Sequence, residues 1–285
     1  MLNNNPTVGD LWNTTPAWGY PFAGSDLAPG RAADTLIPSL GGQVAGLGAY
    51  MQWNDLIYAQ LSGYRTLPAR TQTMLGISPT DEDQIKGSAP YWRLGIQKDW
   101  GKHYLSVGTF GMIANTYPGR DSSQGSDRRR DIGLDAMYQY STDKNDVTVM
   151  LRLIRERASW NAGVALGNAD NTHDTLRSFD TSVSYLYDKT YGIDLAYSGI
   201  RGTTDATLYA DSQNGKPNSD QFSIQLNYMP FNKDGGPSVW KWFNPKLFIQ
   251  YTAFTTFDGL RKNIDGAGRN ASDNNTLYVA AWLPF

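Results

Sequence analysis

The sequence of 285 residues contains no cysteine and no long hydrophobic run, and each absence excludes a class of protein. Without cysteine there is no disulfide, no thiolate metal site and no covalently attached c-type haem. No stretch approaches the roughly 18 apolar residues that a membrane-spanning helix needs. A helical membrane protein is therefore excluded.

The net charge is also small, and histidine is rare. The chain has 25 basic and 27 acidic residues, a net charge of -2, and so offers no general basic surface for nucleic acid. Its two histidines are His103 and His173, and neither has a serine next to it. Two such histidines give little support for a catalytic nucleophile with its base, or for a metal site. We expect neither an enzyme nor a cofactor.

Tyrosine, tryptophan and glycine, by contrast, are plentiful, with 17, 9 and 29 residues respectively. From about residue 43 the pattern has period 2, in segments of about ten to fourteen residues separated by turn signals. In the clearest segment, 131–141, Ile132 and Leu134 share one face while Asp135 lies on the other. One face suits lipid and the other suits water, as in a membrane barrel.

The pattern predicts an all-β fold, an antiparallel transmembrane β-barrel over residues 43–285, with 11 to 12 strands visible. Residues 1–42 are expected to form an extracellular loop or N-terminal segment. Short connections alternate with long ones, which is typical of periplasmic turns and outer loops. The expected strands cover about 43–53, 56–67, 91–100, 103–117, 131–141, 147–156, 179–188, 193–198, 220–230, 246–257 and 275–285.

An odd number of strands conflicts with closure, because the first and last strands of a bacterial single-chain barrel pair antiparallel. The residues after Met1 form a polar run and do not have the pattern of an export signal. With the C-terminus in the periplasm, the first strand would run inward from the outside. We therefore expect either one more strand in the chain or further strands upstream of it.

The last expected strand is apolar at every second position and ends in phenylalanine. This pattern is typical of the C-terminal signal that the barrel-assembly machinery recognises, although an ordinary edge strand that ends in phenylalanine would look the same. The row consists of Leu277, Val279, Ala281, Leu283 and Phe285.

Two segments, residues 2–21 with the motif Asn3-Asn4-Asn5-Pro6 and residues 268–278, carry a family resemblance. Over nearly its whole length the chain resembles the C-terminal half of large proteobacterial outer-membrane proteins, often described as cytochrome c-like because Cys-x-x-Cys-His lies near their N-terminus. The resemblance implies a porin-like barrel in a Gram-negative outer membrane, with Met1 as an internal start and a c-type cytochrome as a partner. The haem motif itself is absent from this sequence.

A mixed set of charged residues is expected to line the lumen. Mixed signs favour salt bridges across the lumen, or a weakly selective pore, over strong ion selectivity. We expect a passive channel for small solutes; the alternative is a structural sheath around a c-type cytochrome or another electron-transfer partner. The predicted lining residues are Arg93, Asp99, Asp135, Arg152, Glu156, Asp180, Asp194 and Lys246.

Four arginines are expected at the outer rim: Arg120, Arg128, Arg129 and Arg130. Guanidinium groups bind phosphates in a bidentate manner, so these residues could contact lipopolysaccharide. A lumen-facing or merely solubilising cluster is an equal alternative.

Overall fold

The computed structural model describes residues 1–6, 28–79, 83–231, 243 and 245–283. These residues form one antiparallel sheet of 13 strands, in the order β1-β2-β3-β5-β6-β7-β8-β9-β10-β11-β12-β13, with β4 paired to β6. The prediction of an all-β, antiparallel fold is confirmed. Eleven strands have seven residues or more, and each of them overlaps a predicted strand. The strands are β1 (Leu2–Asn3), β2 (Val44–Trp53), β3 (Ile57–Thr66), β4 (Gln84–Ile85), β5 (Ala89–Trp100), β6 (His103–Tyr117), β7 (Asp127–Ser141), β8 (Asn145–Ser159), β9 (His173–Tyr187), β10 (Tyr191–Gly202), β11 (Ser219–Tyr228), β12 (Lys246–Thr256) and β13 (Thr276–Trp282).

Helices are short and lie in the connections: α1 (Leu36–Ser39), α2 (Ala69–Met74), α3 (Asn161–Ala165) and the 3-10 turns η3 (Pro118–Arg120) and η4 (Ala271–Asn274). Within the described part of the chain, no helix is long and apolar enough to cross a membrane.

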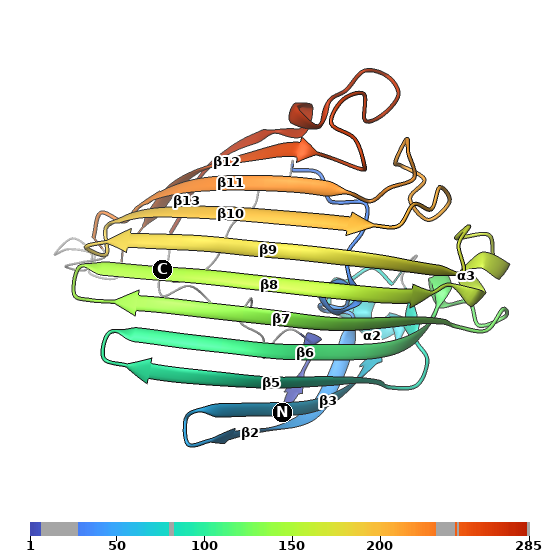
Figure 1. Ribbon diagram of the computed structural model, residues 1–285, viewed down its shortest axis with the longest axis horizontal. Helices are drawn as coiled ribbons and strands as arrows, with labels where there is room; N and C mark the ends of the chain where they lie inside the picture. Colours follow the sequence, from blue (N-terminus) through green and yellow to red (C-terminus); the bar gives the residue numbers. More distant parts are fainter. Residues whose placement is uncertain (7–27, 80–82, 232–242, 244, 284–285) are drawn as a thin grey trace.

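Tight turns gather at one end of the sheet and long connections at the other (Figure 1). The turns β2–β3 and β9–β10 each place two non-glycine residues in the left-handed region, Asn54 and Asp55 in the first and Asp188 and Lys189 in the second. Two consecutive residues in this region give a tight turn whose twist matches that of the flanking strands. The predicted alternation of short and long connections is confirmed for these segments.

Three strands extend further toward the long connections than the sequence pattern predicts. β7 begins at Asp127 instead of about residue 131, β8 continues to Ser159, and β9 begins at His173. The sequence pattern assigns stretches near 118–130 and 158–178 to loops rich in Gly, Asp, Asn, Ser and Pro, but the backbone ladder continues into them. Arg128, Arg129 and Arg130 therefore lie within β7 and not in a loop.

The two faces of the sheet have opposite chemistry, and we name them the outer face and the inner face. The outer face carries exposed apolar side chains, such as Leu134 at 56% exposure, and the inner face carries buried polar ones, such as Arg93 at 3%. A soluble sheet packs its apolar face and solvates the polar one. The exposed apolar side chains on the outer face include Leu47, Leu61, Leu94, Ile96, Val107, Ile132, Leu153, Val183, Leu195, Ile224, Leu226, Ile249, Leu277 and Val279.

Residues 28–42 cover the inner face near the long connections. Leu36 and Ile37 of α1 are fully buried in a cluster with Tyr64, Phe110 and Met112 of neighbouring strands. The main apolar core of the described residues is therefore a small one beneath this segment, and most of the remaining inner face is polar. At the other end of the described N-terminal region, β1 pairs with β2.

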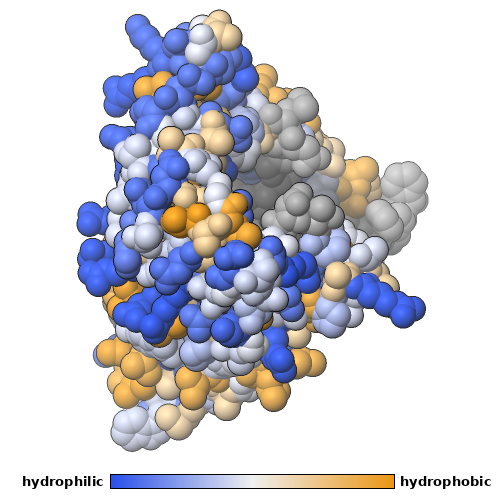
Figure 2. Space-filling view, turned by 90° about the vertical axis from the view of Figure 1, so that its right-hand side faces the viewer, coloured by the Kyte–Doolittle hydropathy of each residue, from blue (hydrophilic) through white to orange (hydrophobic). Residues whose placement is uncertain are grey.

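Aromatic side chains mark the outer face near the tight turns. His103 stacks on Trp100 and Tyr138, and Tyr191 stacks on Tyr228 across a strand pair. The opposite end, viewed in Figure 2, is mostly hydrophilic, with hydrophobic residues gathered toward the bottom, where β2 and β3 lie in Figure 1.

The sheet is open within the described residues, because β13 pairs with β12 alone and the other end of the strand order is β1. The predicted C-terminal row lies on the outer face, where Leu277, Val279, Ala281 and Leu283 are exposed. Phe285 lies outside the described residues.

Candidate functional site

The structure places the predicted lining residues on the inner face. Arg93, Asp135, Arg152, Glu156, Asp180 and Lys246 are buried there and Asp194 is half-buried. Asp99 lies in the same row of β5 as Arg93 but is exposed next to the tight turn, apart from the others.

Arg93 and Asp135 form a bidentate ion pair that reaches across an intervening strand. Nη2 of Arg93 donates to Oδ1 of Asp135 at 2.9 Å, and Nη1 donates to Oδ2. Arg93 is on β5 and Asp135 on β7, so the pair passes over Gly108 of β6. A Cβ atom at Gly108 would lie 2.7 Å from Oδ1 of Asp135 and 2.8 Å from Nη2 of Arg93. A side chain at this position would push the ion pair aside, so glycine leaves the space in which the pair forms.

A second network joins three strands to the N-terminal segment. Arg152 Nη2 donates to Asp180 Oδ2 at 3.1 Å between directly opposed residues of β8 and β9. The other carboxylate oxygen of Asp180 accepts from the hydroxyl of Ser198 at 2.5 Å. Arg31 Nη1 in turn donates to this hydroxyl at 2.8 Å. These contacts hold residue 31 against the inner face.

A third network fixes α1. Arg129 donates to both carboxylate oxygens of Glu156, at 3.2 and 3.0 Å. Glu156 Oε2 accepts from the backbone N–H of Leu36 at 2.7 Å, and Asp131 Oδ2 accepts from that of Ile37 at 2.9 Å. Carboxylates at the first amides of a helix satisfy donors that have no partner inside it. The sheet therefore supplies the N-terminal caps of α1.

Polar side chains continue along the inner face toward the C-terminal strands. Asp194 Oδ2 accepts from Asn227 Nδ2 at 2.6 Å, and Gln225 Nε2 donates to Asn227 Oδ1 at 2.7 Å. Lys246 lies over the ring of Phe248 at 5.8 Å. The inner face thus carries both signs of charge, largely in paired form.

A cavity of about 510 Å³ lies beside α1 near the long connections, and it is lined by Asp83, Arg129, Glu156, Trp160 and Tyr209 among others. Burial raises the pKa of Asp83, and the opposing effect of Arg129 is smaller. Among the residues that the structure describes, no group of three His, Asp or Glu residues could hold a metal ion.

The four arginines expected at the rim are separated by the structure. Arg120 donates to the carbonyl oxygen of Pro79 and to Gln72 Oε1, and Arg129 faces inward toward Glu156. Arg128 and Arg130 are exposed on the outer face. The set is split because Arg128 and Arg130 alternate with Arg129 along a strand, so they point the opposite way.

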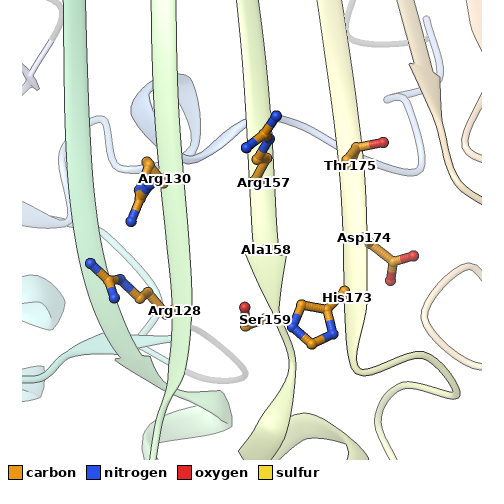
Figure 3. A pocket seen from close by; sticks show the side chains of 8 residues that line it. All are labelled: Arg128, Arg130, Arg157, Ala158, Ser159, His173, Asp174 and Thr175. Carbon is orange, nitrogen blue, oxygen red and sulfur yellow. The ribbon is translucent and has the colours of Figure 1, made fainter.

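Arg128 and Arg130 lie beside three further arginines on the outer face of β8 and β9. We name this set the arginine patch, and Figure 3 shows three of its members near His173. All five side chains are exposed, and among the described residues none of them forms a hydrogen bond or ion pair. The patch consists of Arg128, Arg130, Arg155, Arg157 and Arg177.

Sequence reasoning missed several of these functional residues. The two-residue period could have assigned Arg129 to the inner face and Arg155 and Arg157 to the outer face, because each shares the parity of a neighbour already placed. Arg31 lies in a segment without periodicity, and no local signal identifies its role.

The chain matches no protein-family model and no curated protein. The geometry of the two faces therefore carries the functional argument.

Proposed function

We propose that this chain is the β-barrel of a bacterial outer-membrane protein and acts as a porin-like passive channel for small solutes. The observation that carries the proposal is the inversion of the sheet: apolar side chains are exposed on the outer face, and charged pairs are buried on the inner face. A sheet face that exposes apolar side chains is suited to contact with lipid.

The outer row of β7 supports this environment in detail. It runs from Arg128 and Arg130 through Ile132 and Leu134 to the aromatic Tyr138 and Tyr140. The ten residue-to-residue steps from Arg130 to Tyr140 rise about 34 Å along the strand, or about 24 Å across a bilayer at a tilt of about 45°. This matches the roughly 25 Å apolar band of outer-membrane barrels, which aromatic girdles border.

The inner face supports a narrow and weakly selective path. Arg93 pairs with Asp135 and Arg152 with Asp180, so these charges largely cancel. Residues 31–37 cross the same face and narrow the space beside it. A constricted, nearly charge-balanced interior passes small solutes of either sign. The partners implied are outer-membrane lipid and, for insertion, the barrel-assembly machinery that would read the C-terminal row.

The test is conductance in a planar lipid bilayer. The purified chain should insert and give ohmic steps, and a KCl gradient should give a reversal potential close to zero. Glu156→Gln removes the charge that caps α1 and pairs with Arg129, so it should raise the unit conductance by loosening the constriction. Asp143→Asn, which removes an exposed carboxylate in the β7–β8 turn, serves as the charge-matched control.

Two results would contradict the proposal in different ways. Stable insertion without conductance would exclude the channel but keep the barrel. Failure to insert into any bilayer, with a soluble folded product, would exclude the barrel itself.

A further inference from the structure

The arginine patch lies where the outer rows of three strands leave the apolar zone. Along each strand, in the direction from the long connections to the tight turns, an arginine of the outer row is succeeded by an apolar residue. Ile132 comes after Arg130 on β7, Leu153 after Arg155 on β8, and Phe179 after Arg177 on β9. The change from arginine to apolar residue therefore occurs at a similar level on all three strands. In a membrane this level is the headgroup region of the leaflet that faces the long connections.

The register places like charges directly opposite one another. Arg130 pairs with Arg157 across β7 and β8, and Arg155 pairs with Arg177 across β8 and β9. Opposed like charges destabilise an antiparallel sheet. An anionic ligand that lies between them would offset this cost.

No carboxylate offsets this charge among the described residues. The acidic residues of these strand ends, Asp131, Glu156 and Asp174, are buried on the inner face. The neighbouring arginine on β10 shows the contrast, because Arg201 Nη2 pairs with Asp220 Oδ2 at 2.6 Å on the outer face. The patch is therefore an uncompensated cluster beside a position where the chain does supply a counter-charge.

The type of residue points to phosphate. All five cations are arginines, whose planar guanidinium groups form paired hydrogen bonds with phosphate oxygens. The patch extends about 14 Å along the strands and about 10 Å across them, from the rise per residue and the strand spacing. That area accommodates a sugar headgroup that carries more than one phosphate.

We propose that the arginine patch binds the phosphorylated headgroup of lipopolysaccharide in the outer leaflet. The inference rests on the proposed outer-membrane location and adds a specific lipid site to it. Acyl chains would then lie along Ile132, Leu153 and Phe179, which continue the same rows into the apolar zone.

The experiment measures binding of lipopolysaccharide to the full chain in detergent micelles, so that it does not depend on bilayer insertion. The test variant is Arg130→Gln/Arg155→Gln/Arg157→Gln. Its matched control is Arg65→Gln, which removes an exposed arginine near the same end of the sheet on β3. Each guanidinium near an anionic lipid surface is worth roughly a fivefold change in affinity, so the triple variant should bind roughly a hundredfold more weakly.

Two comparisons identify the ligand chemistry. Enzymatically dephosphorylated lipopolysaccharide should bind as weakly to the unaltered protein as intact lipid binds to the triple variant. Inorganic phosphate at millimolar concentration should not displace the intact lipid. Displacement by phosphate alone would show a small-anion site and overturn the lipid assignment.

Arg157→Lys and Arg157→Gln cover the case in which the triple variant does not fold, as judged by heat-modifiable migration. Lysine keeps the charge but loses the bidentate geometry, so Arg157→Lys should bind between the unaltered protein and Arg157→Gln. Equal affinity of these proteins for intact lipid would overturn the proposal. Loss of insertion in the unaltered protein with lipid binding retained would contradict the proposed function and leave the patch supported.

Discussion

At the scale of the residue, the ion pair between Arg93 and Asp135 has room to form because the residue beneath it is glycine. Arg93 and Asp135 are nearly fully buried, and their contact passes over Gly108. Buried pairs add little net stability when intact, because desolvation opposes their attraction, but removal of one partner leaves a buried charge unpaired.

Asp135→Asn should therefore destabilise the protein by about 3–5 kcal/mol, because the Arg93 guanidinium stays charged without its carboxylate. The double variant Arg93→Gln/Asp135→Asn should lose less than the sum of the two single losses. Urea unfolding midpoints in detergent give the coupling energy from a double-mutant cycle. Additive losses would show that the two side chains act independently.

Leu134 tests the orientation of the outer face at one position. It is 56% exposed in the middle of the apolar zone, so Leu134→Arg should cost about 2–4 kcal/mol in a lipid bilayer. Leu134→Ile should cost less than about 1.5 kcal/mol as the size-matched control. The measurement is the refolding midpoint in lipid vesicles, and equal midpoints for both variants would mean that this face is not in lipid.

At the scale of the element, the long connections are held by buried carboxylates. Asp205 lies in the connection between β10 and β11 and accepts the backbone N–H groups of Leu208 at 2.8 Å and Asn171 at 2.8 Å. It also accepts that of Asp170 at 2.9 Å. One side chain thus joins two connections that are distant in the sequence.

Burial opposes ionisation of Asp205, but these backbone hydrogen bonds outweigh it and lower its pKa. A lowered folded-state pKa contributes stability above the unfolded value of about 3.9, and this contribution is lost as pH falls through the folded pKa. Asp205→Asn should therefore be less stable than the unaltered protein at pH 7, and the difference should shrink below about pH 4. Thermal unfolding from pH 3 to 7 measures it, with Asp211→Asn in the same connection as control. A difference that does not change with pH would show that charge is not the cause.

At the scale of the whole molecule, the edges of the sheet bear on the proposed membrane location. Within the described residues β13 has one partner, β12, and its far edge carries backbone groups that lack a strand partner. Each unsatisfied backbone group in hydrocarbon costs several kcal/mol. The edge must therefore be paired in the inserted state.

We expect the edge amides of β13 to exchange slowly with solvent deuterium in a bilayer, at rates like those of central β8. Hydrogen exchange followed by mass spectrometry compares the bilayer and detergent forms. The loop around Asp211 should exchange rapidly in both forms and serves as the reference. Fast exchange of the β13 edge in the inserted protein would mean that the sheet stays open. That result would contradict the proposed location in a membrane.

Much of the fold was predictable from local pattern, and the misses have a common cause. Period 2 identified the eleven longer strands and the faces of Leu134 and Asp135, because side chains alternate strictly along a strand. It placed the start of β7 at about residue 131, because the outward residues Arg128 and Arg130 are charged. An unbroken run of charged residues such as 127–131 looks like a loop when hydrophobic alternation is the only guide.

The sequence by itself determined the approximate positions of the eleven longer strands, their two chemically different faces, and which connections are short and which long. All three follow from alternation and from turn residues a few positions apart. The tertiary structure alone decided which charges meet. Arg93 reaches Asp135 across 42 residues, and Glu156 caps α1 across 120. Register between strands and the path of residues 28–42 fix these contacts, and neither is encoded in any single strand. For the same reason the arginine patch emerged only once three strands were placed side by side.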